Sequence, residues 1–232
     1  MAAKKKRNGK VAPKDEPRLP VPTRRSTNKT NKLETIARQA SVQRRTKETD
    51  ISVAVDLDGT GQSQIDTMVP FFDHMLEALA KHSLVDMKIH ARGDIEIDPH
   101  HTVEDVGICL GRALVAAMGD RAGMKRYGEA SLPFDEALVR AHIDLCGRSS
   151  FIYRVDIPLG RVGSFDAELC EVFFRALADE GRMNLHLISE YGYNRHHLIE
   201  GCFKSFARAL EQALTIDPRR QGDIASTKGQ LD

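Results

Sequence analysis

The chain has 232 residues, of which 41% are hydrophobic, and it contains no run of about 18 apolar residues of the kind that crosses a membrane. We therefore expect a soluble, cytoplasmic protein with one substantial core or two small ones. The net charge of +1 is unevenly distributed, because residues 1–47 contain 15 Lys and Arg but only 3 Asp and Glu. The four cysteines show no Cys-x-x-Cys spacing, which argues against a disulfide framework or a zinc ribbon.

Residues 1–43 are predicted to be a basic N-terminal extension. They contain the basic run Lys4–Arg7, several prolines and no apolar periodicity. Such a segment cannot bury enough surface to offset the entropy lost on ordering, so we expect disorder. It also lacks the hydrophobic region of a secretory signal. Its charge would permit sequence-independent binding to nucleic acid, but a solvated extension is the simpler interpretation, and we expect no nucleic-acid partner.

The rest of the chain predicts two similar halves, residues 44–133 and 134–220, and a polar tail, residues 221–232. In the first half we expect strands over 51–57, near 64 and over 84–90, with helices over 69–80 and from 100 toward 119. In the second half we expect strands over 137–145, 151–157 and 184–188, with helices over 167–178 and 196–214. This repetition predicts an α+β fold made by internal duplication, in which each half is a four-stranded sheet with its helices packed on one face.

A repeated motif is the strongest functional signal. His100-His101-x-x-Glu104 occurs in the first half and His196-His197-x-x-Glu200 in the second, in a chain with nine histidines. On a helix, residues four apart share a face whereas adjacent residues point about 100° apart. In each copy the first histidine and the glutamate can therefore bind one metal ion, while the second histidine points toward another. Two copies must then meet across an interface to complete either site, so metal binding and assembly should be coupled.

Further segments resemble the imidazoleglycerol-phosphate dehydratase family of histidine biosynthesis, from Arg44 to Lys228. The resemblance is carried by Arg45–Ile51 (RTKETDI), Phe71–Leu76 (FFDHML), His82, Asp98–Asp105 (DPHHTVED), Arg126–Gly128 (RYG), Asp144–Arg148 (DLCGR), Asn194–Glu200 (NRHHLIE), Phe203–Leu210 (FKSFARAL) and Ser226–Gly229 (STKG). It implies a ribosomal protein S5 domain 2-like fold in each half. It also implies a hydro-lyase that converts D-erythro-imidazole glycerol phosphate to imidazole acetol phosphate.

The resemblance further implies two Mn²⁺ ions per active site and a homo-oligomer of 24 subunits built from trimers, with metal sites at subunit interfaces. The metal ligands carried over are His74, His100, His101, Glu104, His196, His197 and Glu200. Imidazole and carboxylate ligands suit manganese, although affinity alone does not exclude zinc or iron. Because the proton to be removed is not acidic, our hypothesis is that the substrate's imidazole ring accepts the charge as an imidazolate held by both ions.

The second half departs from the family pattern at one ligand. Many relatives have a histidine one or two places before the Phe173-Phe174 pair, where this chain has Glu171 and Val172. Glu171, water or His142 could complete the site. His142 lies on a predicted strand, where alternation places it on the face opposite Ala141, so a half-exposed strand histidine is the simpler interpretation.

The resemblance assigns the other polar residues to phosphate binding and proton transfer. Cations for the phosphate are Arg126, Arg148, Lys204 and Lys228, with Ser226 beside the last on a tail that could close over the ligand. Proton transfer falls to Glu48, His82, Glu104 and Lys204. The expected substrate-binding set is Glu48, His74, His82, His100, Glu104, Arg126, Arg148, His196, Glu200, Lys204, Ser226 and Lys228.

Two other functions could also explain parts of this pattern. A non-catalytic metal-binding shell protein would explain paired ligands and assembly but would not need a phosphate clamp. A dinuclear metallohydrolase would usually contain several aspartates and bridging carboxylates, which this imidazole-rich set lacks. The product separates the enzyme classes, because hydrolysis releases phosphate whereas dehydration retains it and creates a ketone.

Overall fold

Two four-stranded sheets have the same strand order. The first contains β1 (Gln39–Arg45), β2 (Thr49–Asp56), β3 (Ser63–Asp66) and β4 (Asp86–Gly93), in the order β1-β2-β4-β3. The second contains β5 (Tyr127–Phe134), β6 (Ala137–Asp144), β7 (Ser150–Arg154) and β10 (Asn184–Tyr191), in the order β5-β6-β10-β7. In both, one edge strand runs parallel to its neighbour, as β3 does to β4 and β7 to β10, and the other pairings are antiparallel. The predicted duplication is therefore present in the topology.

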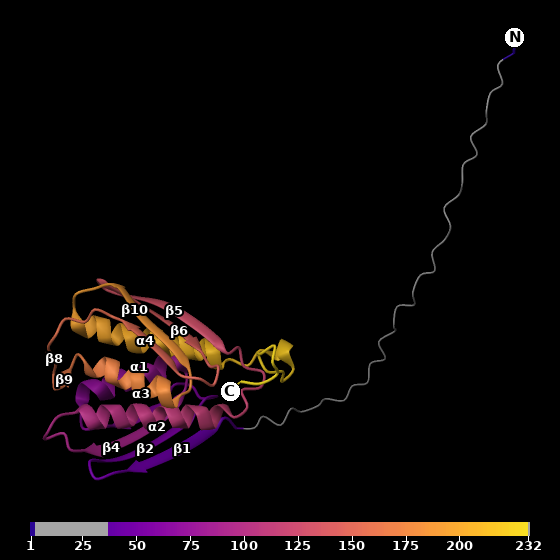
Figure 1. Cartoon of the computed structure of the whole chain (residues 1–232). Helices are drawn as coiled ribbons and strands as arrows, with labels where there is room; N and C mark the ends of the chain where they lie inside the picture. The colour runs from indigo at the N-terminus through magenta and orange to yellow at the C-terminus, as the bar shows by residue number, and fades with distance from the viewer. Residues whose placement is uncertain (3–36, 232) are drawn as a thin grey trace. The chain divides into compact units, whose positions relative to one another are not determined.

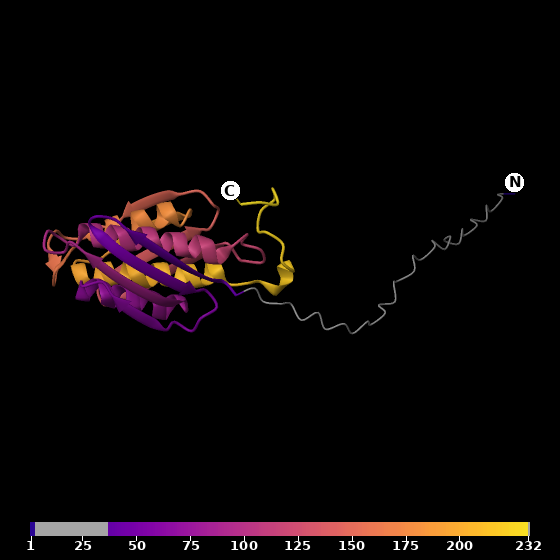
Figure 2. The ribbon, with the colours of Figure 1, turned by 90° about the horizontal axis from the view of Figure 1, so that it is seen from below.

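Four helices lie between the two sheets in the computed structural model, which describes residues 1–2 and 37–231 (Figure 1). They are α1 (Pro70–Ser83), α2 (His100–Met118), α3 (Leu169–Glu180) and α4 (Arg195–Leu214). α1 packs beside α4 and α2 beside α3, so each helix pair joins the two halves. Seen from below, the strands of the first sheet cross the helices behind them (Figure 2). A short hairpin, β8 (Arg161–Val162) and β9 (Phe165–Asp166), precedes α3, and a 3₁₀ turn (Pro218–Arg220) follows α4.

The central strands alternate as their sequences predict. In β2, Ile51, Val53 and Val55 are buried against the helices, and in β6 Val139 and Ala141 are buried in the same way. The helix layer has an aromatic core that fills the space between the sheets. Its buried rings are Phe72, Phe165, Phe173, Phe174, Phe203 and Phe206. This shared core explains why the two halves form one body instead of two domains.

Two predicted boundaries were wrong. β1 begins at Gln39, so residues 39–43 belong to the first sheet and not to the N-terminal extension. β5 begins at Tyr127, so residues 127–133 belong to the second sheet and not to the first half. Both are edge strands, which can keep a polar face and tolerate a proline such as Pro133, so their apolar alternation is weak. The rest of the extension for which we expect disorder, residues 3–36, lies outside the described part of the chain.

Gly128 in β5 shows why that strand has an unusual sequence. A Cβ atom at this position would lie 1.9 Å from the carbonyl oxygen of Ala209 in α4. Glycine therefore permits the backbone of the edge strand to approach the helix directly.

Among the described residues, no helix is long and apolar enough to cross a membrane. All four cysteines are buried and free.

Candidate active site

Both copies of the repeated motif begin in the first turn of a helix. In α2, the Asp98 carboxylate accepts a hydrogen bond from the backbone N–H of His100 at 2.7 Å. In α4, the side chain of Asn194 accepts one from the backbone N–H of His196 at 3.0 Å. Aspartate and asparagine are favoured at this place because they satisfy N–H groups that have no partner within the helix. The local sequence thus fixes where each histidine pair leaves the backbone.

The α4 motif brings an imidazole and a carboxylate together. His196 Nε2 lies 3.1 Å from Glu200 Oε2, and Lys204 Nζ lies 2.5 Å from Glu200 Oε1. Burial alone would raise the pKa of Glu200, but the hydrogen bonds and charges of Lys204 and His196 outweigh it and lower that pKa. Glu200 is therefore held as a carboxylate, the form that binds a cation. Phe71 packs against the His196 ring, with the ring centroids 5.1 Å apart.

α1 runs alongside α4 and places the other two histidines expected in this region. His74 is exposed, one turn beyond Phe71. His82 lies in the last turn of α1, where partial burial and then the charges of Lys204 and Arg208 lower its pKa. A neutral imidazole at neutral pH can accept a proton, as the role predicted for His82 requires.

A groove between α2 and α3 contains the first copy of the motif. It has a volume of about 410 Å³, and its lining includes His100, Glu104, Glu171 and Val172. The departure from the family pattern therefore lies directly beside two expected ligands. Glu171 forms an ion pair with Arg175 at 2.5 Å in the same groove.

His142 lies elsewhere, on the strand face opposite the buried Ala141. It is paired in register with His186 of β10, and its Nδ1 lies 3.4 Å from the Glu129 carboxylate of β5. Within a single chain, Glu171 is thus near His100 and Glu104, whereas His142 is on the outer face of the second sheet.

The second histidine of each motif is held by a carboxylate that the sequence analysis missed. His101 Nδ1 lies 3.0 Å from Asp94 Oδ2, and His197 Nδ1 lies 2.6 Å from Glu136 Oε2. The hydrogen bond from His197, followed by one from the backbone of Asn194, lowers the pKa of Glu136 to about 2. For His101, the hydrogen bond to Asp94 raises the pKa. Only spatial proximity identifies Asp94, since it is seven residues from His101 and no motif contains it.

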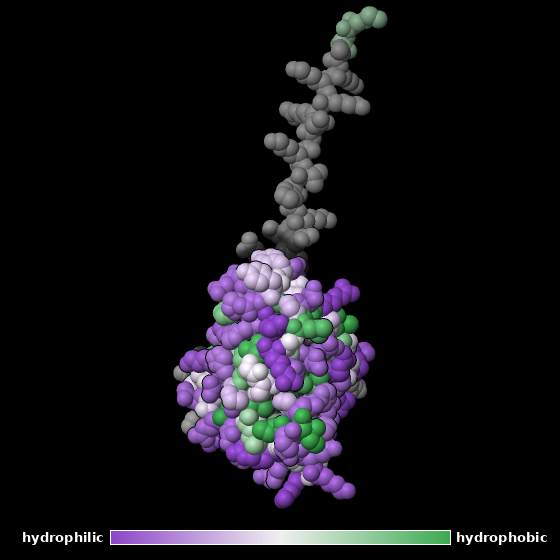
Figure 3. Space-filling view, turned by 90° about the vertical axis from the view of Figure 1, so that its left-hand side faces the viewer, coloured by the Kyte–Doolittle hydropathy of each residue, from purple (hydrophilic) through white to green (hydrophobic). Residues whose placement is uncertain are grey.

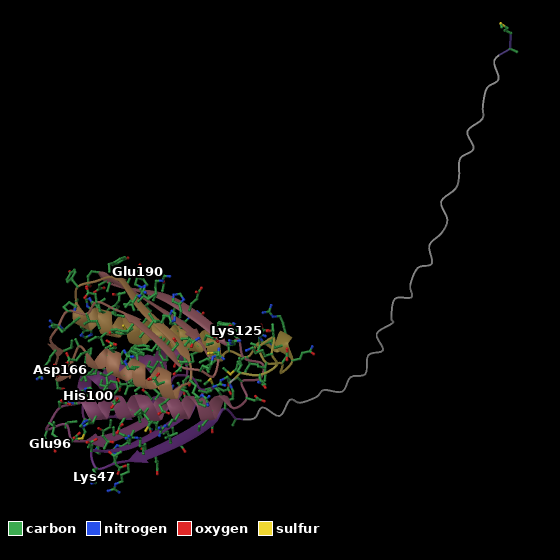
Figure 4. All side chains as sticks on the ribbon, in the orientation of Figure 1. Lys47, Glu96, His100, Lys125, Asp166 and Glu190 are labelled. Carbon is green, nitrogen blue, oxygen red and sulfur yellow. The ribbon has the colours of Figure 1, made fainter. Side chains whose placement is uncertain are left out.

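The predicted phosphate-binding residues near Arg126 lie at the other end of α4. The backbone N–H of Arg126 donates to the carbonyl of Ala213, whereas His196 is in the first turn. With a rise of about 1.5 Å per residue, these ends are about 25 Å apart. In Figure 4, His100 of the first motif lies toward one end of the folded part of the chain, and Lys125, the residue before Arg126, lies near the C-terminal segment.

Arg126 connects this end of the fold to the tail. Its Nε and Nη2 donate to Asp144 at 2.6 and 3.0 Å, and its Nη1 donates to the carbonyl of Ala225 at 2.8 Å. Ser226 and Lys228 follow directly, and the Ser226 Oγ accepts a hydrogen bond from the backbone N–H of Lys228 at 3.2 Å. A guanidinium has five N–H donors, so Arg126 retains two for a ligand. Arg148 is exposed in the turn between β6 and β7, four residues after Asp144.

The donor set fits a borderline divalent metal. It combines imidazole nitrogens with carboxylate oxygens, and the Nδ1 contacts of His101 and His197 leave Nε2 as the atom available for coordination. Nevertheless, residues 37–231 of one chain contain no cluster of three or more His, Cys, Asp or Glu side chains that could hold an ion.

Comparisons with known proteins agree with this arrangement of motifs. Residues 67–210 match the family model for imidazoleglycerol-phosphate dehydratase. The imidazoleglycerol-phosphate dehydratase of Ruegeria pomeroyi is 53% identical over 194 residues, covering 84% of this chain and 100% of its own length. The chain belongs to the imidazoleglycerol-phosphate dehydratase family. The enzyme of Geobacter metallireducens is 48% identical over 196 residues, again covering 84% of this chain and 100% of its own.

Solved structures of imidazoleglycerol-phosphate dehydratases confirm the fold. The Staphylococcus aureus structure matches with a TM-score of 0.71 and 36% identity, covering 77% of this chain and 99% of its own. The Pyrococcus furiosus structure matches with a TM-score of 0.71 and 35% identity, covering 82% and 100%. The predicted α+β duplication, the hydro-lyase class and the place in histidine biosynthesis are thereby confirmed. The roles of individual residues stay predictions.

Proposed function

We propose that this imidazoleglycerol-phosphate dehydratase converts imidazole glycerol phosphate to imidazole acetol phosphate at a dinuclear manganese site shared between subunits. The observation that carries the proposal is the repeated His-His-x-x-Glu motif at the start of α2 and α4. Each copy offers an imidazole and a carboxylate on one helix face and a second imidazole held apart by its own carboxylate. Nothing in the described residues favours hydrolysis over dehydration.

The proposed metal ligands are His74, His100, His101, Glu104, His196, His197 and Glu200. When bound, the two metal ions would supply Lewis-acid stabilisation for negative charge on the imidazole ring of the substrate. Glu171 is the best candidate in this chain for the ligand that many relatives supply as histidine, because it lines the groove with His100 and Glu104. To bind the metal, Glu171 would have to break its ion pair with Arg175.

The remaining residues would bind the phosphate and move protons. Arg126, Arg148, Ser226 and Lys228 would hold the phosphate, with Arg126 also fixing the tail through Ala225. Lys204, the other predicted phosphate cation, lies instead on Glu200 at the metal-binding end. Glu48 and His82 would transfer protons at carbon and oxygen. Glu48 lies in the exposed turn between β1 and β2. After the hydrogen bond to Asp94, its negative charge contributes to raising the pKa of His101. Lys204 would keep Glu200 ionised, while Glu104 would act from the metal site.

The separation of these groups supports a shared active site. The metal-binding and phosphate-binding ends of one chain are about 25 Å apart along α4, farther than a single small substrate can bridge. Exposed Ile97 and Tyr193 lie three residues before His100 and His196, with 72% and 76% of their surface accessible. The end of the molecule that carries both motifs shows hydrophobic groups among hydrophilic ones (Figure 3). These features favour subunit contacts there, as in the proposed assembly of 24 subunits from trimers.

The first test is turnover of imidazole glycerol phosphate by metal-stripped protein, with and without added Mn²⁺, read by ketone formation. We expect ketone only with a divalent metal and no release of inorganic phosphate. Parallel additions of Zn²⁺ and Fe²⁺ identify the metal that supports the reaction. Folded, metal-bound protein that makes no ketone with any of the three metals would contradict the proposal, and phosphate release would indicate a hydrolase.

A second test addresses the proposed coupling of metal and assembly. His101→Ala and His197→Ala should each reduce both turnover and the proportion of assembled protein, because each histidine is expected to bind metal across a subunit boundary. Mass photometry with and without Mn²⁺ measures the assembly. His90→Ala is the control, since His90 lies in β4 away from the motifs. Intact assembly with unchanged metal content in either test variant would refute the coupling.

A further inference from the structure

His101 and His197 are held from different parts of the fold. Asp94, which contacts His101, follows the end of β4. Glu136, which contacts His197, lies in the turn between β5 and β6. The two halves therefore share the motif but not the source of the carboxylate that holds its second histidine.

The Glu136 contact defines which nitrogen of His197 carries the proton. An ionised carboxylate only accepts hydrogen bonds, so a neutral His197 ring donates from Nδ1 and keeps its lone pair on Nε2, which lies 3.8 Å from the exposed Asp135 carboxylate. The other Glu136 oxygen accepts from the backbone N–H groups of Asn194 at 2.9 Å and Tyr193 at 3.4 Å. Both oxygens thus face donors. A glutamine here would place its NH₂ group against one of these donors or force the ring into the other tautomer.

Glu48 occupies in the first half the place that Glu136 occupies in the second. Each directly precedes the second strand of its sheet, which begins at Thr49 or Ala137 and has eight residues in both cases. Within residues 37–231, Glu48 makes no side-chain hydrogen bond; it is exposed and lines one surface pocket with Asp94. Asp94 occupies the Nδ1 atom of His101 instead.

We infer that Asp94 and Glu136 are positioning residues that fix His101 and His197 with Nε2 presented for coordination. The inference rests on the proposed metal-dependent function. The two equivalent glutamates differ in their contacts. Glu136 is hydrogen-bonded to His197 and to the backbone of the loop before α4, whereas Glu48 is exposed. Metal-ligating histidines commonly depend on such carboxylates.

The experiment compares three charge-removing variants of the full chain: Asp94→Asn, Glu136→Gln and Glu48→Gln. Mn²⁺ affinity is measured by isothermal titration of metal-stripped protein, and assembly is measured by mass photometry. The values of kcat and KM are determined at saturating Mn²⁺. Glu96→Gln, in the same loop as Asp94, and Glu190→Gln, in the second half, are matched controls for the loss of a negative charge.

We expect Asp94→Asn and Glu136→Gln to weaken Mn²⁺ binding by about 10- to 100-fold and to shift metal-dependent assembly to higher Mn²⁺. Glu48→Gln should keep the wild-type Mn²⁺ affinity while kcat falls by about 10²-fold or more. Both controls should behave as wild type. Glu136→Asp, which retains an acceptor-only group, should recover part of the lost affinity.

A purely structural role gives a different result. If Glu136 only anchors the loop before α4, Glu136→Gln should lower the melting temperature of the metal-free protein and leave Mn²⁺ affinity unchanged, which would overturn the inference. Equal loss of affinity in Glu48→Gln would show that loss of any nearby negative charge weakens Mn²⁺ binding, which would also overturn the inference. Wild-type protein that neither binds Mn²⁺ nor makes ketone would instead mean that the proposed function has failed.

Discussion

Asp105 shows how adjacent residues of one motif can do different work. Glu104 lines the groove between α2 and α3, whereas the next residue, Asp105, is buried and accepts hydrogen bonds from Arg44 of β1 and Thr49 of β2. Adjacent positions on a helix point about 100° apart, so the same turn offers one carboxylate to the site and one to the core. The sequence motif identifies both acidic residues but does not reveal this division.

We predict that Asp105→Ala destabilises the protein by about 3 kcal/mol, since it leaves a partly buried Arg44 without its carboxylate. Urea unfolding of the metal-free protein measures the change. Asp50→Asn is the control, because the Asp50 ion pair with Arg45 is exposed and its loss should cost less than about 0.5 kcal/mol. Equal losses in the two variants would contradict the structural role of Asp105.

At the scale of elements, the contact between α2 and α3 depends on glycine. A Cβ atom at Gly107 would lie 2.8 Å from the carbonyl oxygen of Phe173, and one at Gly111 would lie 2.6 Å from the backbone nitrogen of Gly181. The absence of side chains lets the two helices approach closely. Their separation in turn sets the width of the groove that contains His100 and Glu104.

We predict that Gly111→Ala destabilises the protein by about 1–3 kcal/mol, because the added methyl group meets backbone atoms that have no room to move. Helix propensity alone would give the opposite sign, since alanine is favoured over glycine by about 1 kcal/mol in a helix. The direction of the shift in urea midpoint therefore decides between the two effects. A stabilised variant would show that the helices can separate without cost.

The same helix pair carries an ion pair with a defined pH dependence. Arg112 donates two hydrogen bonds to Glu180, at 2.9 and 2.8 Å, and this lowers the pKa of Glu180 below its ordinary value of 4.5. A carboxylate with a lowered folded-state pKa contributes stability above the unfolded pKa and loses it as the pH falls through the folded pKa.

Glu180→Gln should therefore cost about 0.5 kcal/mol at pH 7, a small value because the pair is partly exposed. The difference from wild type should shrink as the pH falls below 4.5. Urea unfolding of metal-free protein at pH 7, 5 and 3.5 follows it, with Glu96→Gln as the control for an exposed glutamate. A difference that is unchanged at pH 3.5 would indicate that the lost interaction is not ionic.

At the scale of the whole molecule, the fold separates the two ends of the proposed active site. His196 and Arg126 lie near opposite ends of α4, and the described residues of one chain contain no complete set of metal ligands. Both ends belong to the same rigid helix, so in this fold they stay about 25 Å apart. Assembly would have to join the metal-binding end of one subunit to the phosphate-binding end of another.

Mixing two inactive variants tests this arrangement. His196→Ala should disable the metal-binding end and Lys228→Ala the phosphate-binding end, so neither alone should turn over substrate well. Dissociated and reassembled together with Mn²⁺ in equal amounts, they should recover up to roughly a quarter of wild-type turnover, because random mixing places two intact ends in some sites. Each variant reassembled alone is the control. No recovery in verified mixed assemblies would place each active site within one chain.

The sequence by itself determined the local and repeated features of this protein. Hydrophobic alternation located β2, β4, β6 and β10, helical periodicity located all four long helices, and the spacing of the histidine motif identified the two candidate ligand sets. These signals are local, because periodicity and capping act over a few residues. The edge strands β1 and β5 escaped because their pairing with a neighbour, and not their own apolar content, keeps them in the sheet.

Only the tertiary structure decided which distant groups meet. It placed Asp94 on His101 and Glu136 on His197, aligned Glu48 with Glu136, put Glu171 in the groove with His100, and separated both motifs from Arg126. Such contacts depend on how helices and strands pack across the core, and spacing along the chain does not encode them. The residue roles themselves stay predictions, because in the proposed site they depend on metal ions and on a neighbouring subunit.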